Sequence, residues 1–405
     1  MNEFYGIFKK IAFDNHYVSV TKALNSAATT AETKATMKPL TKPEIQYAHM
    51  GQLIIHKDVC YASFLQNPGD DSEALDSKTS SITLAVFPLA RALAEDFDPE
   101  KDIEYHKLGA LGRSCAGYNS ISVYKCTSMC MIGDELYICF CFQCEDQRFR
   151  VFRVVYDTKS GSIGKKTAVR LLYNGELFDL TDETLNRIYE ERGFKKSNST
   201  MVEIVSRWSE YKGEYYSTFL IGGTPNNGVI VKTRDFKVME FIDVIPHNEL
   251  GSAEAGSYVK DGVMYIACRQ DYYVCRMLII AYDIENGEWY DPNYIEDGTC
   301  RPWFFEKDGD LWLINTTEEF VRRYANLSKL NDFPKWERPG VQFDTVATLF
   351  DCGFYYAVAE YQGRHFFVSS GDISHHIIRF GELKITQRDP AQVNAKLLKL
   401  FEEDQ

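Results

Sequence analysis

Glu254, Arg269 and Arg301 are residues whose types and spacing suit chemistry on an anionic ligand. A guanidinium group binds a carboxylate through two parallel hydrogen bonds, so two arginines can hold one carboxylated ligand in a fixed orientation. Glutamate and histidine side chains, such as Glu254 and His49, transfer protons when their surroundings tune their pKa values. These residues are far apart in sequence, so the fold must bring them together before they can act on one ligand.

A short phrase that recurs six times indicates which fold does this. Each copy has a polar or glycine turn, an apolar residue, an aromatic anchor and further apolar residues; the anchors are Tyr61, Tyr137, Tyr216, Tyr265, Trp312 and Tyr355. Consecutive anchors are 76, 79, 49, 47 and 43 residues apart. The last three intervals are typical of a four-stranded blade, in which the phrase forms the turn into the second strand. We therefore predict an all-β fold, a six-bladed β-propeller, with five or seven blades as alternatives.

The two longer intervals predict insertions, for which residues 67–81, 99–120 and 173–199 are the candidates. In the third of these, Thr181 or Asp182 is suited to cap a short helix.

We expect a single domain over residues 1–405, closed by strands from its two ends. Segments around residues 11–24 and 375–385 have the pattern of these strands, and residues 25–38 are expected to be irregular. Residues 387–404 are predicted to form a C-terminal helix that carries an apolar stripe.

Blade geometry converts the repeat into a predicted site. The first strand of a blade starts at the rim where the second strand ends, so residues about eleven before an anchor and about four after it meet at one mouth. This rule predicts His49, Glu254 and Tyr361 as catalytic residues at the mouth. The predicted substrate-binding residues are Arg269, Arg301, Asp344, Lys125, Arg113 and Glu360, of which Arg113 would reach the mouth from an inserted loop.

Two segments resemble the sialidase-like β-propeller superfamily, six-bladed proteins with BNR repeats that act on glycans. SAEAGSYVKDGVMYIACRQ resembles the family's glutamate, hairpin and arginine, and GTCRPWFFEKDGDLWLIN resembles the later blade that supplies another arginine. The resemblance implies that Glu254 activates a nucleophilic tyrosine. It also implies that Arg269 and Arg301 are two of three arginines that hold the substrate carboxylate.

The sequence departs from this family at two positions. The family's tyrosine opens the strand before the last hairpin, where this chain has Phe343, so the nucleophile is expected to be missing, with Tyr361 or Tyr258 near the mouth instead. The family's first arginine is matched by Ala48 or His49. With a histidine at the rim, the chain instead resembles propeller lyases and rhamnosidase-type enzymes that act beside a uronic acid. Such elimination chemistry needs a base, an acid and a cation that neutralises the carboxylate.

The expected function is therefore cleavage of a glycosidic bond next to a carboxylated sugar, by hydrolysis or by elimination. The alternative is a non-catalytic propeller that binds a glycan or a protein at its mouth. Structural roles compete with both: His49 could bond a neighbouring strand, and the two arginines could pair with Glu254 or Asp344. More charged residues are predicted at the rim than ion pairs among them would account for, which favours a functional site.

Composition limits the partners. The chain has 405 residues and a formal net charge of −13, which argues against nucleic acids and anionic membranes. An acidic oligosaccharide or another small carboxylated ligand is the expected partner, because it needs only a local basic pocket. The chain has 11 cysteines without a disulfide spacing, no long apolar stretch and no signal-peptide pattern, which predicts a cytoplasmic protein. Clustered cysteines such as Cys139 and Cys141 are expected to be buried thiols, so no metal or other cofactor is predicted.

Overall fold

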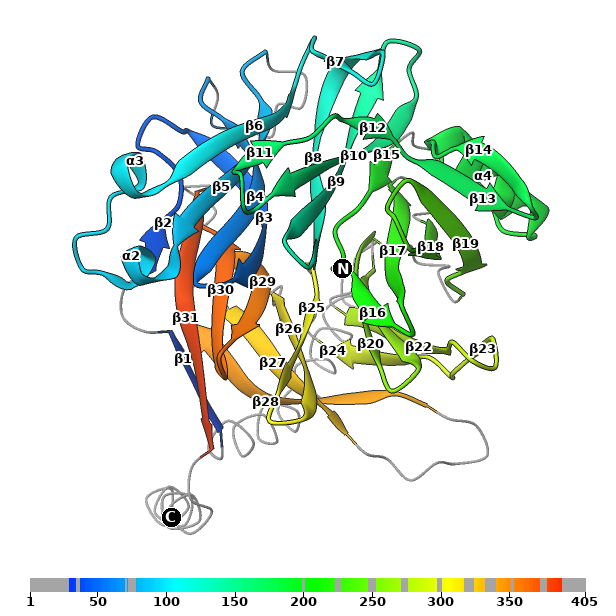
Figure 1. Ribbon diagram of the computed structural model, residues 1–405. Coiled ribbons are helices and arrows are strands. Elements are labelled where there is room, and N and C mark those ends of the chain that lie inside the picture. Colours follow the sequence, from blue (N-terminus) through cyan, green and yellow to red (C-terminus); the bar gives the residue numbers. More distant parts are fainter. Residues whose placement is uncertain are drawn as a thin grey trace, which may run out of the picture.

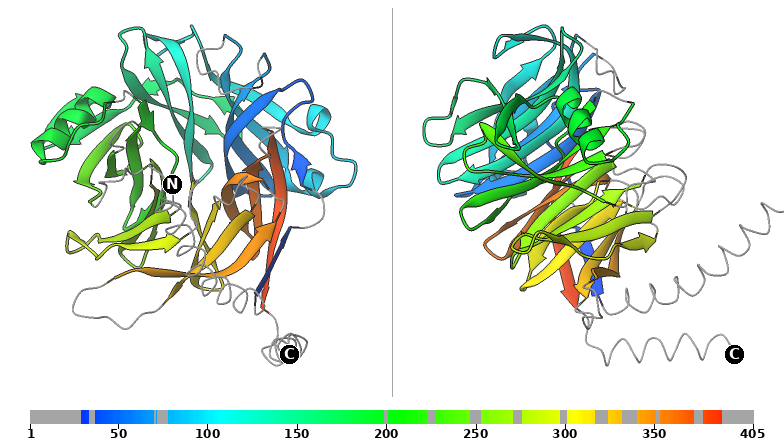
Figure 2. Two further views of the ribbon diagram at one scale, coloured as in Figure 1. Left: turned by 180° about the vertical axis from the view of Figure 1, so that it is seen from behind. Right: turned by 90° about the vertical axis from the view of Figure 1, so that its right-hand side faces the viewer.

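Six sheets lie around a common centre, as the blades of a propeller do (Figure 1). The computed structural model describes residues 29–33, 37–69, 71, 78–198, 201–222, 227–246, 253–270, 276–296, 301–316, 324–331, 340–350, 353–371 and 377–387. Two further views show the sheets fanning out from the middle of the molecule (Figure 2). The predicted all-β propeller class is confirmed.

The first three sheets follow the chain from residue 47 to residue 244. The main strands of each are given in chain order, starting from the centre of the propeller. The first sheet contains β3 (Tyr47–His56), β4 (Val59–Asn67), β5 (Ser81–Pro88) and β6 (Glu104–Ala110). The second contains β8 (Tyr118–Ile132), β9 (Glu135–Cys144), β10 (Phe149–Asp157), β11 (Ser162–Ile163) and β12 (Thr167–Ala168), with β7 (Ser114–Cys115) paired to β8. The third contains β15 (Met201–Glu203), β16 (Ser209–Tyr211), β17 (Glu214–Gly222), β18 (Asn227–Thr233) and β19 (Val238–Val244), extended by β13 (Arg170–Tyr173) and β14 (Glu176–Asp179).

The last three sheets complete the ring. The fourth contains β20 (Ala253–Lys260), β21 (Val263–Arg269), β22 (Arg276–Asp283), β23 (Glu288–Trp289) and β24 (Asn293–Glu296). The fifth contains β25 (Trp303–Lys307), β26 (Asp310–Thr316), β27 (Tyr324–Asn331) and β28 (Gln342–Phe350). The sixth contains β29 (Phe354–Tyr361), β30 (Arg364–Ser370), β31 (Ile378–Gln387), β1 (Thr29–Thr33) and β2 (Lys38–Pro39).

The sixth sheet joins strands from distant parts of the chain. β1 pairs antiparallel with β31, from Thr29 opposite Gln387 to Thr33 opposite Leu383. The expectation of an irregular segment over residues 25–38 is therefore wrong for β1, because its backbone groups pair with β31. The strand expected near residues 11–24 lies outside the described residues, as does the C-terminal helix expected over 387–404 apart from Gln387, which ends β31.

The aromatic anchors occupy the second strand in the first five sheets, as predicted: Tyr61 lies in β4, Tyr137 in β9, Tyr216 in β17, Tyr265 in β21 and Trp312 in β26. The sixth anchor differs, because Tyr355 lies in β29, the first strand of its sheet. The segment that was expected to open that sheet, which contains Phe343, is β28 and pairs with β27 at the outside of the fifth sheet. A local phrase of turn and aromatic residue does not distinguish the two inner strands, so the predicted register slips by one strand here.

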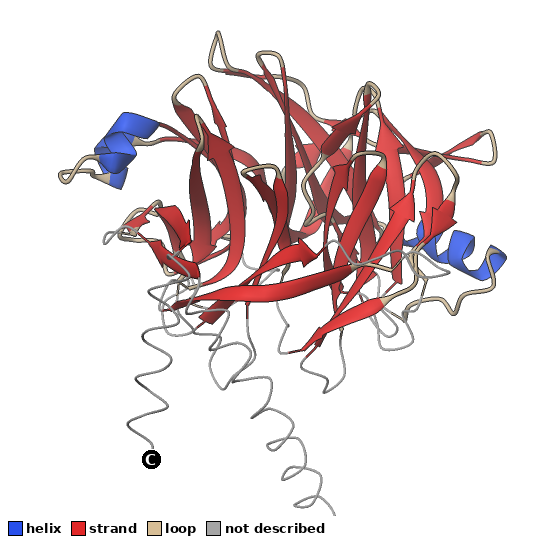
Figure 3. Cartoon of the chain, turned by 90° about the horizontal axis from the view of Figure 1, so that it is seen from below, coloured by secondary structure: helices blue, strands red, loops and turns tan. Residues whose placement is uncertain are grey.

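Each sheet buries both of its faces against its neighbours. β22 shows this pattern, because Met277 to Ala281 are consecutive residues that are all at most 1% exposed. Strands buried on both faces are apolar throughout rather than alternating. The helices α2 (Leu89–Leu93), α3 (Pro99–Asp102) and α4 (Asp182–Glu191) lie at the outside of the molecule (Figure 3). None of the helices in the described segments has the length and apolar character needed to span a bilayer.

Polar side chains join the inner strands at the centre of the propeller. The Gln52 amide on β3 donates to the carbonyl oxygens of Thr127 and, at 3.1 Å, Val205, and accepts from the Met129 N–H at 3.0 Å. The Arg301 guanidinium donates to the Gly51 carbonyl oxygen at 2.8 Å and to that of Val205 at 3.2 Å. Gln52 is 2% exposed and Arg301 is 1% exposed, so these bonds are formed away from water.

Further contacts carry this polar belt around the ring. Ser128 Oγ donates to the Ser206 carbonyl oxygen at 2.5 Å, and the hydroxyls of Ser206 and Ser257 lie 2.6 Å apart. Trp303 Nε1 donates to the Val358 carbonyl oxygen at 2.9 Å, which links the fifth sheet to the sixth. The polar belt consists of Gln52, Ser128, Ser206, Ser257, Arg301 and Trp303, together with Glu254 and His49. Hydrogen bonds between sheets fix how neighbouring blades are placed, which apolar packing alone specifies less sharply.

Three inner strands begin with a β-bulge. Pairing shifts between His49 and Gln52 in β3, between Ala253 and Gly256 in β20, and between Phe354 and Ala357 in β29. Each bulge holds one residue that is not glycine at positive φ: Met50 at 55°, Glu254 at 49° and Tyr355 at 58°. This conformation is unfavourable for residues with a side chain, and its concentration at one end of the inner strands is typical of a functional site.

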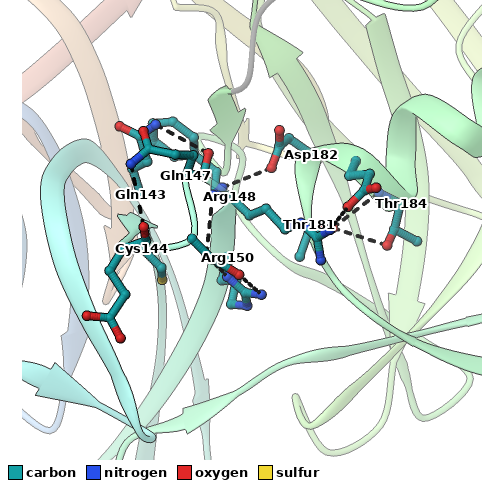
Figure 4. Close-up of polar contacts among 12 residues, drawn as sticks. Gln143, Cys144, Gln147, Arg148, Arg150, Thr181, Asp182 and Thr184 are labelled. Atoms are coloured by element: carbon teal, nitrogen blue, oxygen red, sulfur yellow. Dashed lines mark hydrogen bonds and ion pairs between the residues drawn. The ribbon is translucent and has the colours of Figure 1, made fainter.

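The insertion that carries α4 is anchored to the hairpin between β9 and β10 (Figure 4). Thr181 Oγ1 accepts from the Thr184 N–H at 3.1 Å, so Thr181 is the N-cap, one of the two predicted caps. The next residue, Asp182, accepts through Oδ1 from the Phe149 N–H at 2.9 Å. On the hairpin, Arg150 forms two bonds of 2.6 Å with the Asp146 carboxylate. Burial raises the pKa of Asp182 to about 6, against the opposing effect of its backbone hydrogen bonds.

Replacing Gln52 by leucine is expected to destabilise the protein by roughly 3 kcal/mol, because the Thr127 carbonyl and the Met129 N–H are left buried without this partner. The matched control is Gln143→Leu, since Gln143 Nε2 makes only a 3.3 Å bond to the Gln147 carbonyl at an exposed hairpin end. The control should change stability by no more than about 0.5 kcal/mol. Urea unfolding monitored by fluorescence measures both, and equal midpoints for the two variants would contradict a stabilising role for the belt.

Gly256→Ala is expected to destabilise the β20 bulge by about 1–3 kcal/mol, the usual range for overpacking. An added Cβ would lie 2.3 Å from the Pro302 carbonyl oxygen, which belongs to the backbone and has little room to move. Gly340→Ala is the control, because no atom lies within 4 Å of its added Cβ. Thermal unfolding of both variants tests this, and an unchanged midpoint for Gly256→Ala would show that the bulge is not tightly packed.

The Asp182 carboxyl is expected to make stability fall as pH rises from about 4 to about 6. Its folded pKa lies above its ordinary value, so the folded protein binds this proton more tightly and loses the advantage on ionisation. Asp182→Asn keeps an acceptor for the Phe149 N–H, so it should gain stability over the wild type across this pH range. Asp157→Asn should show the opposite trend, because backbone hydrogen bonds lower the pKa of Asp157. Urea midpoints at several pH values measure both trends, and parallel curves would refute the assignment.

Candidate functional site

Tyr355 and Glu254 form the centre of the candidate site. They lie at the bulged starts of β29 and β20, and the Tyr355 hydroxyl donates a short hydrogen bond to Glu254 Oε1. Tyr355 is 2% exposed and Glu254 is 5% exposed, so little water competes for this bond. A carboxylate that accepts a bond from a phenol is placed to remove its proton, which would convert the phenol into a nucleophile.

Arg269 supplies the positive charge of the site. It ends β21 and pairs across the hairpin with Ala253, the residue before Glu254. Its Nη1 lies 3.2 Å from Glu254 Oε1, and its side chain is 27% exposed, much more than those of Glu254 and Tyr355. The hairpin geometry therefore brings the predicted residues Glu254 and Arg269 together. A partly exposed guanidinium next to a buried carboxylate pairs with it and also presents N–H groups to a ligand.

Two further hydrogen bonds that involve Glu254 are donated by backbone N–H groups. Its Oε2 accepts from the Arg301 N–H at 3.1 Å, and its own backbone N–H lies 3.4 Å from Glu203 Oε2. Glu203 ends β15 and is 7% exposed. The first contact orients the Glu254 carboxylate, and the second holds the Glu254 backbone at the bulge.

His49 lies beside Tyr355. The centroids of the two rings are 4.3 Å apart. His49 Nδ1 shares a 2.9 Å hydrogen bond with Ser370 Oγ at the end of β30, and the histidine is 2% exposed. The bond to Ser370 joins the sixth sheet to the first. His49 therefore makes the hydrogen bond to a neighbouring strand that was expected for a purely structural role, and it also contacts Tyr355. An imidazole fixed in this way is a suitable group for proton transfer at a neighbouring atom.

Arg301 lies under the site rather than in its opening. Its guanidinium donates to the carbonyl oxygens of Gly51 and Val205 and lies 5.4 Å from the Trp303 ring centroid. These contacts and its burial assign it to the polar belt, and they do not support its expected role as a second carboxylate clamp.

Three of the predicted residues lie away from Tyr355. Tyr361 and Glu360 are at the far end of β29, and Tyr361 accepts from the Asp58 N–H at 3.0 Å in the hairpin between β3 and β4. Tyr361 is six positions along the strand from Tyr355, which is about 20 Å of extended chain. Asp344 lies in the outer strand β28, where the amides of Asn331 and Gln342 donate to it at 2.6 and 2.8 Å. All three were placed by the slipped register of the sixth anchor.

The other two predicted binding residues are less closely tied to the site. Lys125 lies in β8 where the pairing with β9 shifts, between Val123 and Thr127, and its side chain is outside the described part. Arg113 is exposed in the turn between β6 and β7.

Tyr355 is the site residue that the sequence interpretation missed. The expectation that the nucleophilic tyrosine is missing was based on matching Phe343 to it, but Phe343 lies in the outer strand β28, whereas Tyr355 contacts Glu254. The available signal was the DCGFYYAV phrase itself, in which two tyrosines follow Gly353 and Phe354. Tyr355 was counted there as a blade anchor.

The site consists of a carboxylate, a phenol, an imidazole and a guanidinium. Within the described ranges, no three histidine, cysteine, aspartate or glutamate side chains gather as they would around a metal ion. The four groups are sufficient in type for nucleophilic attack, proton transfer and carboxylate binding.

Comparison with known proteins yields only structural matches. No family model and no curated protein matches the sequence. A Dyadobacter fermentans protein of unknown function superposes with a TM-score of 0.57 at 11% identity, over 89% of this chain and 100% of that one. The sialidase of Trypanosoma rangeli in complex with sialic acid gives 0.52 at 12% identity, and the endosialidase of phage phi92 gives 0.54 at 13%.

The two sialidases are matched over most of this chain but only part of their own. The match covers 92% of this chain and 60% of the Trypanosoma rangeli enzyme, and 88% of this chain and 70% of the phage enzyme. At such low identity the likeness concerns architecture. The chain has a sialidase-like β-propeller fold.

Proposed function

We propose that this protein is a glycosidase that cleaves the bond next to a carboxylated sugar, with Tyr355 as its nucleophile. The observation that carries the proposal is the connection from the Tyr355 hydroxyl through the Glu254 carboxylate to the Arg269 guanidinium. It supplies a nucleophile, its base and a cation for the ligand in one place. The propeller likeness to sialidases supports the same class of reaction.

In the proposed reaction, Glu254 takes the phenol proton as the Tyr355 oxygen attacks the anomeric carbon. The bond from that carbon to the leaving oxygen breaks, and the leaving oxygen takes up a proton, for which His49 beside Tyr355 is the candidate donor. Water then attacks the anomeric carbon and gives a proton to His49, the bond from that carbon to the Tyr355 oxygen breaks, and the proton held by Glu254 returns to the phenol. Arg269 holds the sugar carboxylate throughout, which fixes the anomeric carbon over the phenol oxygen.

A non-catalytic glycan-binding role is the second candidate. The observation in its favour is that Tyr355 and Arg269 both engage the same oxygen, Glu254 Oε1, so that the charges of the site are paired. A binding protein would use the exposed edge of Arg269 and leave the pair intact. Elimination is a third outcome, in which an acid–base pair acts on the sugar without covalent attachment.

Tyr355→Phe is expected to lower kcat/KM by about 10³-fold or more, because it removes the attacking oxygen. The matched control is Tyr361→Phe, the same change at the far end of β29, which should leave activity unchanged. Arg269→Met should raise KM for carboxylated substrates about 10²-fold, and it should raise KM for neutral glycosides far less. The assays use sialosides and uronate-containing oligosaccharides, with reducing ends and the absorbance of an unsaturated product as readouts.

Covalent trapping distinguishes the candidates. A Trypanosoma rangeli sialidase structure contains 2,3-difluorosialic acid as a covalent intermediate, and this compound and its uronate counterpart are the probes. Mass spectrometry should locate the adduct on Tyr355, and Tyr355→Phe should show none. An unsaturated product without an adduct would establish elimination instead. Ligand binding without turnover of any substrate would favour the binding protein and refute the glycosidase.

A further inference from the structure

A groove lies at the outer edge of the propeller, away from the candidate site. Its volume is about 740 Å³, which is within the range of small-molecule sites. The turn between β7 and β8, the segment between β11 and β12, and the strands β13 and β14 form its walls. In Figure 1 these elements lie at the rim of the second and third sheets, whereas Tyr355 and Glu254 start inner strands.

Two lysines give this groove an unbalanced positive charge. Lys165 and Lys166 both line it, and neither takes part in an ion pair among the described residues. The third cation, Arg170, is compensated, since it lies 3.2 Å from Asp179 and donates to the carbonyl oxygens of Phe178 and Leu177. On a chain of net charge −13, two uncompensated ammonium groups in one groove favour an anionic ligand.

A rigid aromatic ring stands beside the lysines. Tyr118 lines the groove, and the Arg150 guanidinium lies 4.3 Å from its ring centroid. Arg150 is itself fixed by two bonds to Asp146, so the tyrosine is supported from behind. A partly exposed tyrosine offers an apolar ring and a hydroxyl at low entropic cost, a combination suited to ligands with both apolar and hydroxyl surfaces.

The turn next to Tyr118 leaves the backbone open to a ligand. Ala116 and Gly117 have positive φ values of 52° and 90°, and no atom lies within 4 Å of a Cβ added at Gly117. Both residues line the groove. A ligand can therefore approach the main chain here without displacing a side chain.

We propose that this groove is an accessory binding site for a carboxylated oligosaccharide. The lysines would bind its carboxylates, and Tyr118 and the open turn would contact its sugar rings. The choice of ligand rests on the proposed function, whereas the positive charge and the aromatic wall of the groove do not. An accessory site would hold a part of the glycan remote from the bond that is cleaved, because it shares no residue with the candidate site.

The test measures binding in the Arg269→Met background, where the clamp of the candidate site is removed. Isothermal titration uses an oligogalacturonate and an oligosialic acid as probes, with the carboxyl-reduced form of the oligogalacturonate as a neutral control, at low and at physiological salt. Adding Lys165→Gln and Lys166→Gln should weaken acidic-ligand binding about tenfold and reduce its salt dependence. The charge-matched control changes another adjacent pair, Lys195→Gln and Lys196→Gln, and should bind as the background does.

Full binding by the Lys165/Lys166 variant at low salt, or an equal loss in the Lys195/Lys196 control, would overturn the accessory site. Failure of the proposed function has a different signature. It would appear as no cleavage of any substrate by the unmutated protein, while the lysine-dependent binding persists. If both proposals hold, the Lys165/Lys166 change alone should leave kcat on a short aryl glycoside unchanged and raise KM for a long acidic chain.

Discussion

The buried amide of Gln52 and the buried guanidinium of Arg301 hold together strands that no backbone ladder joins. In a propeller, the backbone ladders run within each sheet, and neighbouring sheets meet mainly through side chains. Gln52 bonds to the backbone of the second and third sheets, and Arg301 to that of the first and third. Because a buried donor or acceptor without a partner costs about 1–3 kcal/mol, these bonds penalise any other placement of the blades. The candidate site depends on this arrangement, since Glu254 receives the Arg301 N–H and His49 bonds to Ser370 in the next sheet.

The bulges show how the same strands serve both packing and chemistry. A regular strand would direct alternate side chains into the neighbouring sheets, where they pack against apolar residues. The extra residue in β20 and in β29 turns Glu254 and Tyr355 out of this alternation and toward each other. Both residues hold unfavourable positive φ values, and the surrounding belt and core stabilise that conformation. Because the surrounding structure holds this strained backbone in place, the two side chains keep a fixed geometry that a more relaxed loop would not provide.

Much of the architecture could be predicted from the sequence, because the anchor phrase reflects a physical unit, the tight turn between two inner strands. The pairing of Glu254 with Arg269 followed from the same unit, since a hairpin fixes which residues face each other. The sixth anchor failed because its phrase opens β29, the first strand of the sixth sheet, whereas the preceding strand β28 is the outermost strand of the fifth sheet. Without that register, the place of Tyr355 in the site could not be predicted. The same error placed Asp344, Glu360 and Tyr361 at the site, from which they are distant. The burial of Arg301 was also beyond a single sequence, because its partners are backbone carbonyls, which no residue type reveals.

The pairing of β1 with β31 sets an order of events during synthesis. β1 leaves the ribosome among the earliest of the described strands, whereas its partner emerges more than 340 residues later. Until then the outer edge of the sixth sheet does not exist, and β1 has no native strand to pair with. The first five sheets can form as the chain grows, but the ring closes only after translation has passed β31. A nascent chain therefore carries an exposed, unpaired strand for most of its synthesis, and this period is when the protein is most open to pairing with another copy.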